Sequence, residues 1–279
     1  MKSKIILAAL CTACSLLALS SLTSCSCSSS NEVDNTKIAS SGYEKSTANE
    51  LYKYDVFDNH ICLTAYIGKE ETINIPQEID GKPVTEILSN TFYNIDENVK
   101  VVVIPKTVTY IESHSFTNNK LESIELDKDN PSYIIENAAL MDKDKTILLA
   151  FPGKSSIEEF TIPSTVSSIP SGVFSGCTKL KKVKIPSSVK NIETFAFMGS
   201  GITQAELPEG VERIGMGVFW NCKNLETLTL PKSLKTIDNP ETTCQNCPAL
   251  KTVKGYDSTD AEEITKADGV TAKYESLGE

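Results

Sequence analysis

Ile-Pro and Leu-Pro pairs recur at nearly constant spacing in the second half of this sequence. Their prolines are Pro163, Pro186, Pro208 and Pro231, which are 23, 22 and 23 residues apart. Each pair has an apolar residue two positions before it, and apolar residues three and six positions after its proline. In three of the four cases a Phe follows in register. A fixed period of about 20 to 50 residues predicts a solenoid in which every repeat is one turn.

The turn over residues 180–197 shows why each position holds its residue type. Val183 and Ile185 alternate with Lys182 and Lys184, so a strand there directs the apolar side chains inward and the lysines outward. The proline that follows lacks an N–H and ends the strand. The next apolar pair and the Phe then form two further sides. We expect a three-sided coil whose parallel strands stack about 4.8 Å apart, so that each turn covers its neighbour.

The remaining segments fit around this array. Alternating apolar residues on both sides of an Asp-Asn-His turn predict a hairpin over residues 54–66, which would cap the open end of the coil. An insert over 127–159 interrupts the repeat, and we expect a second hairpin there around 142–145. The Asp-x-Asp pair in that turn lacks the Gly and distal Glu of a calcium loop. We assign the solenoid to 51–256 and a cap or tail to 257–279.

The first 24 residues have the features of an export signal. Lys2 and Lys4 precede a mostly apolar run that ends in Leu22-Thr23-Ser24-Cys25. This ending resembles the bacterial lipobox, whose Cys becomes the acylated N-terminus, so Cys25 is the expected lipidation site. A cleaved signal without a lipid and a retained membrane helix are the alternatives, since the run is close to the spanning length of about 20 residues. Residues 25–50 are expected to form a flexible tether.

Charge and cysteine usage narrow the class of protein further. The chain has 27 Lys and Arg against 37 Asp and Glu, a net charge of −10, which argues against nucleic acid as a partner. Cys177, Ser200, Cys222 and Cys247 share one repeat position, where a small buried side chain at a corner explains them. The spacing of Cys244 and Cys247 also permits a metal site or a dithiol, and their redox state stays open.

The repeat pattern, Leu-x-x-Val/Leu-x-Ile/Leu-Pro-x-x-Val-x-x-Ile with Phe-x-x-Cys, resembles the BspA-type leucine-rich repeat of bacterial surface proteins. The likeness covers residues 54–255, including the lead-in at 75–84 and the hairpin that ends at 148–152. It departs at Ser200, where the family often has Cys, and before the Phe, where Ala is usual but this chain has Thr91, Ser115, Val173 and Val218. The resemblance implies a mainly β, leucine-rich-repeat-like right-handed coil of about 22–23-residue turns with short parallel strands. It also implies an adhesin or ligand-binding surface protein.

The sequence shows no set of residues for catalysis. Its two histidines are His60 and His114, and neither has a Ser or Cys neighbour with a role distinct from the repeat. Gly199-Ser200-Gly201 lacks the Lys of a phosphate-binding loop. We therefore expect a protein that is not an enzyme and that uses no cofactor and no metal.

Outward residues of the stacked strands are the expected binding face, because they form columns across several turns. The candidate contact residues are Val101, Val103, Lys182, Lys184, Gln204, Glu206, Thr227 and Thr229, with Trp220 as a further aromatic contact. The insert either covers the two valines or leaves them as an apolar contact. A purely solvated face with no ligand is the alternative.

Together these features predict a monomeric lipoprotein that is exported to the bacterial cell envelope and exposed on its surface. Its lipid would hold it to a membrane, in a leaflet that the sequence does not specify. Its partner would be an unidentified host or microbial protein, bound without catalysis. The alternatives are a glycan-binding accessory protein and a structural lipoprotein of the envelope.

Overall fold

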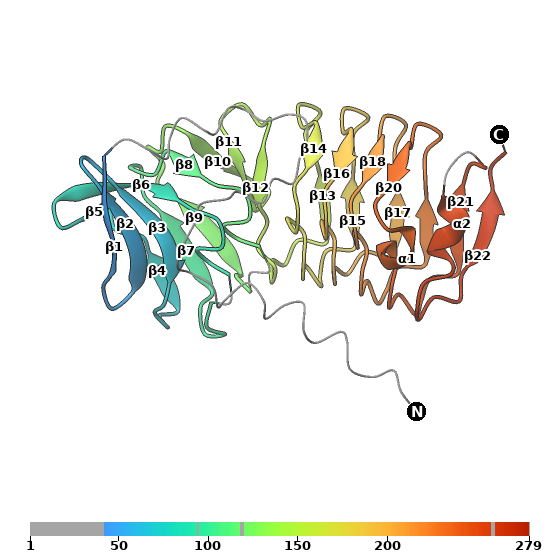
Figure 1. Ribbon diagram of the computed structural model, residues 1–279, viewed down its shortest axis with the longest axis horizontal. Coiled ribbons are helices and arrows are strands. Elements are labelled where there is room, and N and C mark those ends of the chain that lie inside the picture. Colours follow the sequence, from blue (N-terminus) through green and yellow to red (C-terminus); the bar gives the residue numbers. More distant parts are fainter. Residues whose placement is uncertain (1–41, 94, 118–119, 258–259, 279) are drawn as a thin grey trace. The chain divides into compact units, whose positions relative to one another are not determined.

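A computed structural model describes residues 42–93, 95–117, 120–257 and 260–278. These residues form a β-solenoid of about nine turns, and successive turns lie side by side from β4 to β22 (Figure 1). The expected fold class is thereby confirmed. The export signal and Cys25 lie outside the described residues.

One side of the solenoid, which we call the strand face, carries the strands that precede each proline. They pair in parallel within three separate sheets. The strands are β4 (Thr72–Asn74), β7 (Val101–Ile104) and β9 (Ser123–Leu126); β13 (Glu159–Thr161) and β15 (Lys182–Lys184); and β17 (Gln204–Glu206), β19 (Thr227–Thr229), β21 (Thr252–Gly255) and β22 (Lys273–Ser276). The alternation of apolar and polar residues along each strand explains this side.

The second side carries parallel strands that each end at an Ile. In all but the first of them this Ile lies six positions after the proline, and the strand has two residues. They are β6 (Lys82–Ile87) and β8 (Tyr110–Ile111), and farther along β14 (Ser168–Ile169), β16 (Asn191–Ile192), β18 (Arg213–Ile214) and β20 (Thr236–Ile237). The third side consists of turns around each Phe. There the N–H groups of Phe174 and Phe197 donate to carbonyls of the next turn at 2.9 Å. Three sides per turn agree with the sequence pattern.

The N-terminal cap is a small antiparallel sheet. It contains β1 (Tyr43–Ala48), β2 (Tyr52–Phe57) and β3 (Ile61–Tyr66), and β3 pairs in parallel with β6 of the first repeat, beside the short strand β5 (Glu78–Ile79). The β2–β3 hairpin confirms the prediction. Strand β1 lies inside the range assigned to the tether, which is therefore wrong for 43–48. Its side chains are mostly exposed, so no apolar alternation marks it in the sequence.

The insert and the C-terminus both extend the coil. The insert forms β10 (Tyr133–Glu136), β11 (Ala139–Asp142) and β12 (Leu148–Ala150), an antiparallel sheet that includes the expected second hairpin. Beyond β21, the chain forms α2 (Ala261–Ile264) and then β22, which pairs in parallel with β21. Residues 260–278 thus form one more turn and not a loose tail. Helix α1 (Pro240–Thr243) stands on the third side.

A column of Phe rings runs through the core. Phe174, Phe197 and Phe219 are buried and stacked, with ring centroids 5.1 and 5.4 Å apart. The buried cysteines lie at the adjacent corner, where the thiols of Cys222 and Cys247 donate to carbonyls at 3.1 and 3.0 Å. The acceptors are the carbonyls of Phe197 and Phe219, which also accept from the N–H groups of Ser200 and Cys222, so each thiol adds a second hydrogen bond to a buried oxygen.

Candidate binding face

The predicted contact residues on the strands do point outward in columns. Lys182, Lys184, Gln204 and Glu206 are exposed, while the remaining strand residues are half-buried: Val101, Val103, Thr227 and Thr229. The four Lys, Gln and Glu positions lie on two successive turns, in β15 and β17. These four side chains therefore form the most exposed part of the predicted face.

Val101 and Val103 form an apolar spot among polar neighbours. The register aligns Val101 with Thr72 on β4 and with Ser123 on β9. The insert contacts the face at β9, through its strand β10. Val101 and Val103 therefore stay partly exposed on β7, so the insert does not cover them fully.

Most charge along the edge of the strand face is neutralised between neighbouring turns. Lysines just before the strands pair with glutamates one turn earlier: Lys100 with Glu71 at 2.6 Å, and Lys181 with Glu158 at 2.9 Å. The hydrogen bond from Lys100 holds the pKa of the Glu71 carboxyl below its usual value. Within the described residues, Lys182 and Lys184 have no such acidic partner. These two amines are thus available to an external group.

The strand face is split between β15 and β17, and we call this split the seam. Strand β15 ends one sheet and β17 begins the next. A narrow gap there is lined by Val183, Ile185, Ile202 and Ala205. Val183 is half-buried, whereas the central residues of the neighbouring strands, such as Phe160 of β13 and Leu228 of β19, are buried.

The seam has a cause in the sequence. The repeat that contains β17 has 22 residues instead of 23, and the missing residue falls between Ser200 and Ile202. In addition, Ala205 stands where other turns place Val, Leu or Phe. A shorter corner and a smaller side chain leave the two strands without the packing that joins their neighbours. The 22-residue repeat and Ala205 are both visible in the sequence, but the sequence did not predict that they would interrupt the strand pairing.

A second opening lies where the insert leaves the solenoid. An open groove of about 560 Å³ runs beside β9 and β10. Its walls combine apolar and charged side chains, including Leu126, Ile134, Ile135, Lys128 and Lys143. In the part of the chain that the structure describes, no strand pairs with the groove edge of β9. The predicted face thus contains two irregular places, the seam and this groove.

Comparison with known proteins assigns the repeat. A sequence profile of the BspA type leucine rich repeat region matches residues 66–145 and 149–264, in six copies. The chain belongs to the BspA-type leucine-rich repeat family. No curated protein sequence matches it.

Solved structures with the same fold come from bacteria. The pneumococcal vaccine antigen PcpA is 23% identical with a TM-score of 0.59, over 71% of this chain and 51% of PcpA. A leucine-rich repeat protein from Eubacterium ventriosum is 20% identical with a TM-score of 0.56, over 84% of this chain and 86% of that protein. The chain thus spans about half the length of PcpA. At these identities the likeness establishes the fold alone.

Trp220 lies apart from the strand face, on the third side. In this chain, the position two residues before a core Phe has a positive φ, as at Gly172 and Gly217. Phe195 occupies this position with φ 58°, which is unusual for a bulky residue. Its ring contacts the half-buried Trp220 ring at 5.7 Å, and Met216 beside it is 38% exposed. The third side therefore carries its own aromatic surface, separate from the predicted face.

The histidines occupy different surroundings. His114 is exposed in a turn of the third side, whereas His60 lies in the cap beside other polar groups. Within the described residues, no helix is long and apolar enough to span a membrane.

Proposed function

We propose that this chain is a lipid-anchored bacterial surface protein that binds a protein partner through its strand face, centred on the seam. The observation that carries the proposal is the combination at the seam of half-exposed Val183 and Ile185 with the unpaired Lys182 and Lys184. The BspA-type repeat is a family of binding scaffolds from bacterial surface proteins, which supports a binding role over an enzymatic one.

The chemistry of the seam indicates what a partner would present. Protein interfaces combine an apolar centre with a polar rim. Here the apolar centre is narrow, and the rim has two amines on one side and Gln204 and Glu206 on the other. A partner segment with an apolar side chain next to a carboxylate fits this arrangement. Since the whole chain is acidic, such a contact depends on the local amines and weakens as salt rises.

A binding screen with charge-reversal variants tests this proposal. The intact chain is used as bait against host matrix proteins and surface extracts of neighbouring bacteria, and any captured partner is titrated. We expect Lys182→Glu/Lys184→Glu to lower the affinity about tenfold or more. Lys53→Glu/Lys106→Glu, which makes the same charge change at exposed lysines of the cap and first turns, should bind like the parent chain. Equal affinity of both variants, or no saturable partner, would contradict the proposal.

The anchor is tested separately. Cys25→Ala should abolish incorporation of a labelled fatty acid. A variant that still carries the label would refute Cys25 as the acylated residue. Protease treatment of intact cells should remove the solenoid if it is exposed at the surface. Survival of the protein in that treatment would favour a structural envelope role.

A glycan ligand is the second candidate, favoured by one observation. The Phe195 and Trp220 rings are partly exposed, and Phe195 holds a backbone conformation that costs about 1–2 kcal/mol for a residue with a side chain. Such strain often marks a functional position. A glycan array with the intact chain would show a signal that Trp220→Ala removes. A signal unchanged by that substitution would exclude this aromatic surface as the site.

A further inference from the structure

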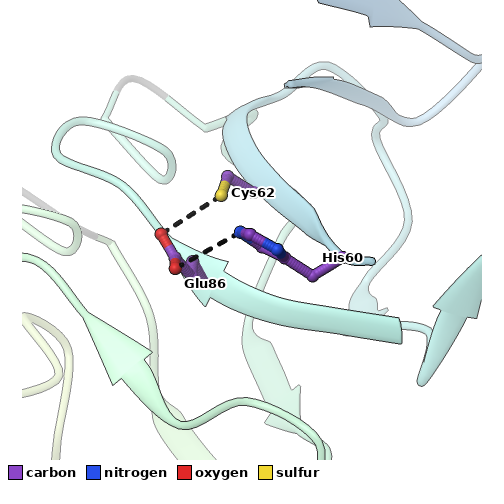
Figure 2. Close-up of side chains that lie close together, drawn as sticks. All are labelled: His60, Cys62 and Glu86. Carbon is purple, nitrogen blue, oxygen red and sulfur yellow. Dashed lines mark hydrogen bonds and ion pairs between the residues drawn. The ribbon is translucent and has the colours of Figure 1, made fainter. Parts of the chain in front are cut away.

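Three side chains with metal-binding atoms meet where the N-terminal cap joins the first repeat. His60 and Cys62 come from the cap hairpin, Glu86 comes from β6, and all three point toward one another (Figure 2). The Cys62 thiol donates to Oε2 of Glu86 at 3.1 Å, and Nε2 of His60 lies 3.5 Å from Oε1 of the same carboxylate. One ligand atom from each residue lies within 4.8 Å of the others.

The strand geometry brings these groups together. Residues two apart on a strand point to the same face, which places His60 beside Cys62. The parallel register of β3 and β6 then sets Glu86 directly opposite Cys62. Ile61, which stands between His60 and Cys62, points into the core, as does Leu63 on the other side of Cys62. The cluster therefore stands on the outer face of the cap sheet, where Asp55 of β2 lies opposite Cys62 and adds negative charge.

His60 is held in an orientation suited to a metal ligand. Its Nδ1 lies 2.7 Å from Oδ1 of Asn59, and its ring stacks on Phe57 at 4.6 Å. With the Nδ1 proton donated to Asn59, Nε2 carries a free electron pair. Nε2 is buried and has no hydrogen-bond partner among the described residues, yet it faces a carboxylate oxygen. Two electron pairs that face each other in this way repel, and a proton or a cation between them removes that repulsion.

We propose that His60, Cys62 and Glu86 bind a zinc ion, with water as the fourth ligand. Zinc takes nitrogen, sulfur and oxygen ligands in tetrahedral sites, at about 2.0–2.3 Å. Such bond lengths place the ligand atoms about 3.3–3.6 Å from one another. The observed 3.1 and 3.5 Å run to the two different oxygens of the Glu86 carboxylate, and one atom of each residue lies within 4.8 Å of the others, so side-chain rotations that draw these atoms together complete the site. Asn59 would act as the outer partner that orients the ligating histidine.

The site also has an entry path and a consequence for the fold. The side chains of His60 and Glu86 are 18% and 12% exposed, so solvent reaches the edge of the cluster, while Nε2 of His60 and the Cys62 side chain are buried. Two ligands belong to the cap hairpin and the third to the first repeat. A bound zinc ion would therefore fasten the cap onto the solenoid and stabilise the folded chain.

Zinc titration of the full chain tests this proposal. After removal of metals with a chelator, Zn²⁺ is titrated in competition with a chromophoric chelator, and bound zinc is measured by mass spectrometry. We expect one more zinc ion per parent chain than per Glu86→Gln chain. Co²⁺ in place of zinc should give a sulfur-to-cobalt absorption band that Cys62→Ser removes. The melting temperature should rise with zinc in the parent and not in Glu86→Gln.

Matched variants separate this site from other thiols. His60→Asn and Glu86→Gln keep every cysteine of the chain, and each should lower the affinity for this zinc ion about tenfold or more. His114→Asn, at the other histidine, should match the parent. Zinc content and melting shift that are equal in the parent, His60→Asn and Glu86→Gln would place the metal elsewhere and overturn the proposal. His60→Asn and Glu86→Gln therefore test the proposal even if Cys62→Ser fails to fold.

Discussion

Gly201 lies so close to Thr178 of the preceding turn that a Cβ on Gly201 would be 2.0 Å from the Thr178 carbonyl oxygen. The Gly201 N–H donates to the carbonyl of Cys177 at 3.0 Å, which holds the two turns together at this corner. This is the corner that is one residue shorter than in the other repeats. The close approach of the two backbones thus accompanies the 22-residue turn.

Gly201→Ala is therefore expected to destabilise the protein. The added methyl group meets backbone, which has to shift, at a cost of about 1–3 kcal/mol. Urea unfolding followed by circular dichroism measures the change. Gly176→Asn is the control, since Gly176 has open space around it and the corresponding positions are Asn221 and Asn246. A Gly201→Ala chain as stable as Gly176→Asn would contradict the expected clash.

Phe197→Ala should lower stability by about 3–5 kcal/mol. The ring is fully buried between Phe174 and Phe219, so its removal leaves a cavity in the middle of the column. Phe197→Leu fills most of that volume and should cost clearly less. Thermal or denaturant unfolding of the two variants distinguishes these outcomes, and equal losses would mean that the ring column is not what stabilises this region.

Asn130 is expected to fasten the insert to the preceding turn. Its buried amide donates to the carbonyls of Pro105 and Val108 at 3.0 Å, and its Oδ1 accepts from the N–H groups of Ser132 and Tyr133 at 2.9 Å. Asn130→Ala removes all four hydrogen bonds and leaves the buried Val108 carbonyl and Tyr133 N–H without this partner, which costs about 3 kcal/mol or more.

Hydrogen exchange measures this effect locally. In Asn130→Ala, amides of β10 should exchange faster, together with those of the turn that contains Pro105. Asn224→Ala, at an exposed asparagine, should change stability by less than about 0.5 kcal/mol. Unchanged protection of β10 in Asn130→Ala would contradict the predicted role.

Tyr133 should make stability fall at alkaline pH. Burial raises the pKa of its hydroxyl to about 12, from 10.0 in its ordinary state. Between these values the unfolded chain releases this proton while the folded chain keeps it. Stability is therefore full below pH 10 and declines toward pH 12, by up to about 1.4 kcal/mol per pH unit.

Comparing Tyr133→Phe with the parent isolates this contribution. At neutral pH the variant loses the hydrogen bond to the Thr109 carbonyl, 3.1 Å in length, at a cost of about 1 kcal/mol. Above pH 10 its stability should fall less steeply than that of the parent in denaturant unfolding. Identical slopes would show that Tyr133 does not contribute to the alkaline transition.

The repeat itself was predictable because the same local pattern returns in every turn. Alternation around Val183 or Leu228 sets the strand, the proline ends it, and the Phe marks the third side. Each of these preferences acts over a few residues, so several turns provide independent support for one fold. The cap hairpin and the hairpin of the insert were predictable for the same local reason.

Strands without that pattern were not predictable. The side chains of β1 are almost all exposed, and β22 alternates too weakly to differ from a polar tail. Both strands form because a neighbouring strand offers its free edge, β2 in one case and β21 in the other. Pairing with an edge depends on backbone hydrogen bonds, which the side-chain sequence does not encode.

The sequence by itself determined the coil, its period and which strand residues point outward, because these depend on contacts that repeat from turn to turn. Only the tertiary structure decided where the coil is irregular. The seam arises because β15 and β17 do not pair, and the cluster of His60, Cys62 and Glu86 arises from the register of β3 with β6. Register joins residues more than 20 positions apart, and its outcome depends on the packing of both strands at once.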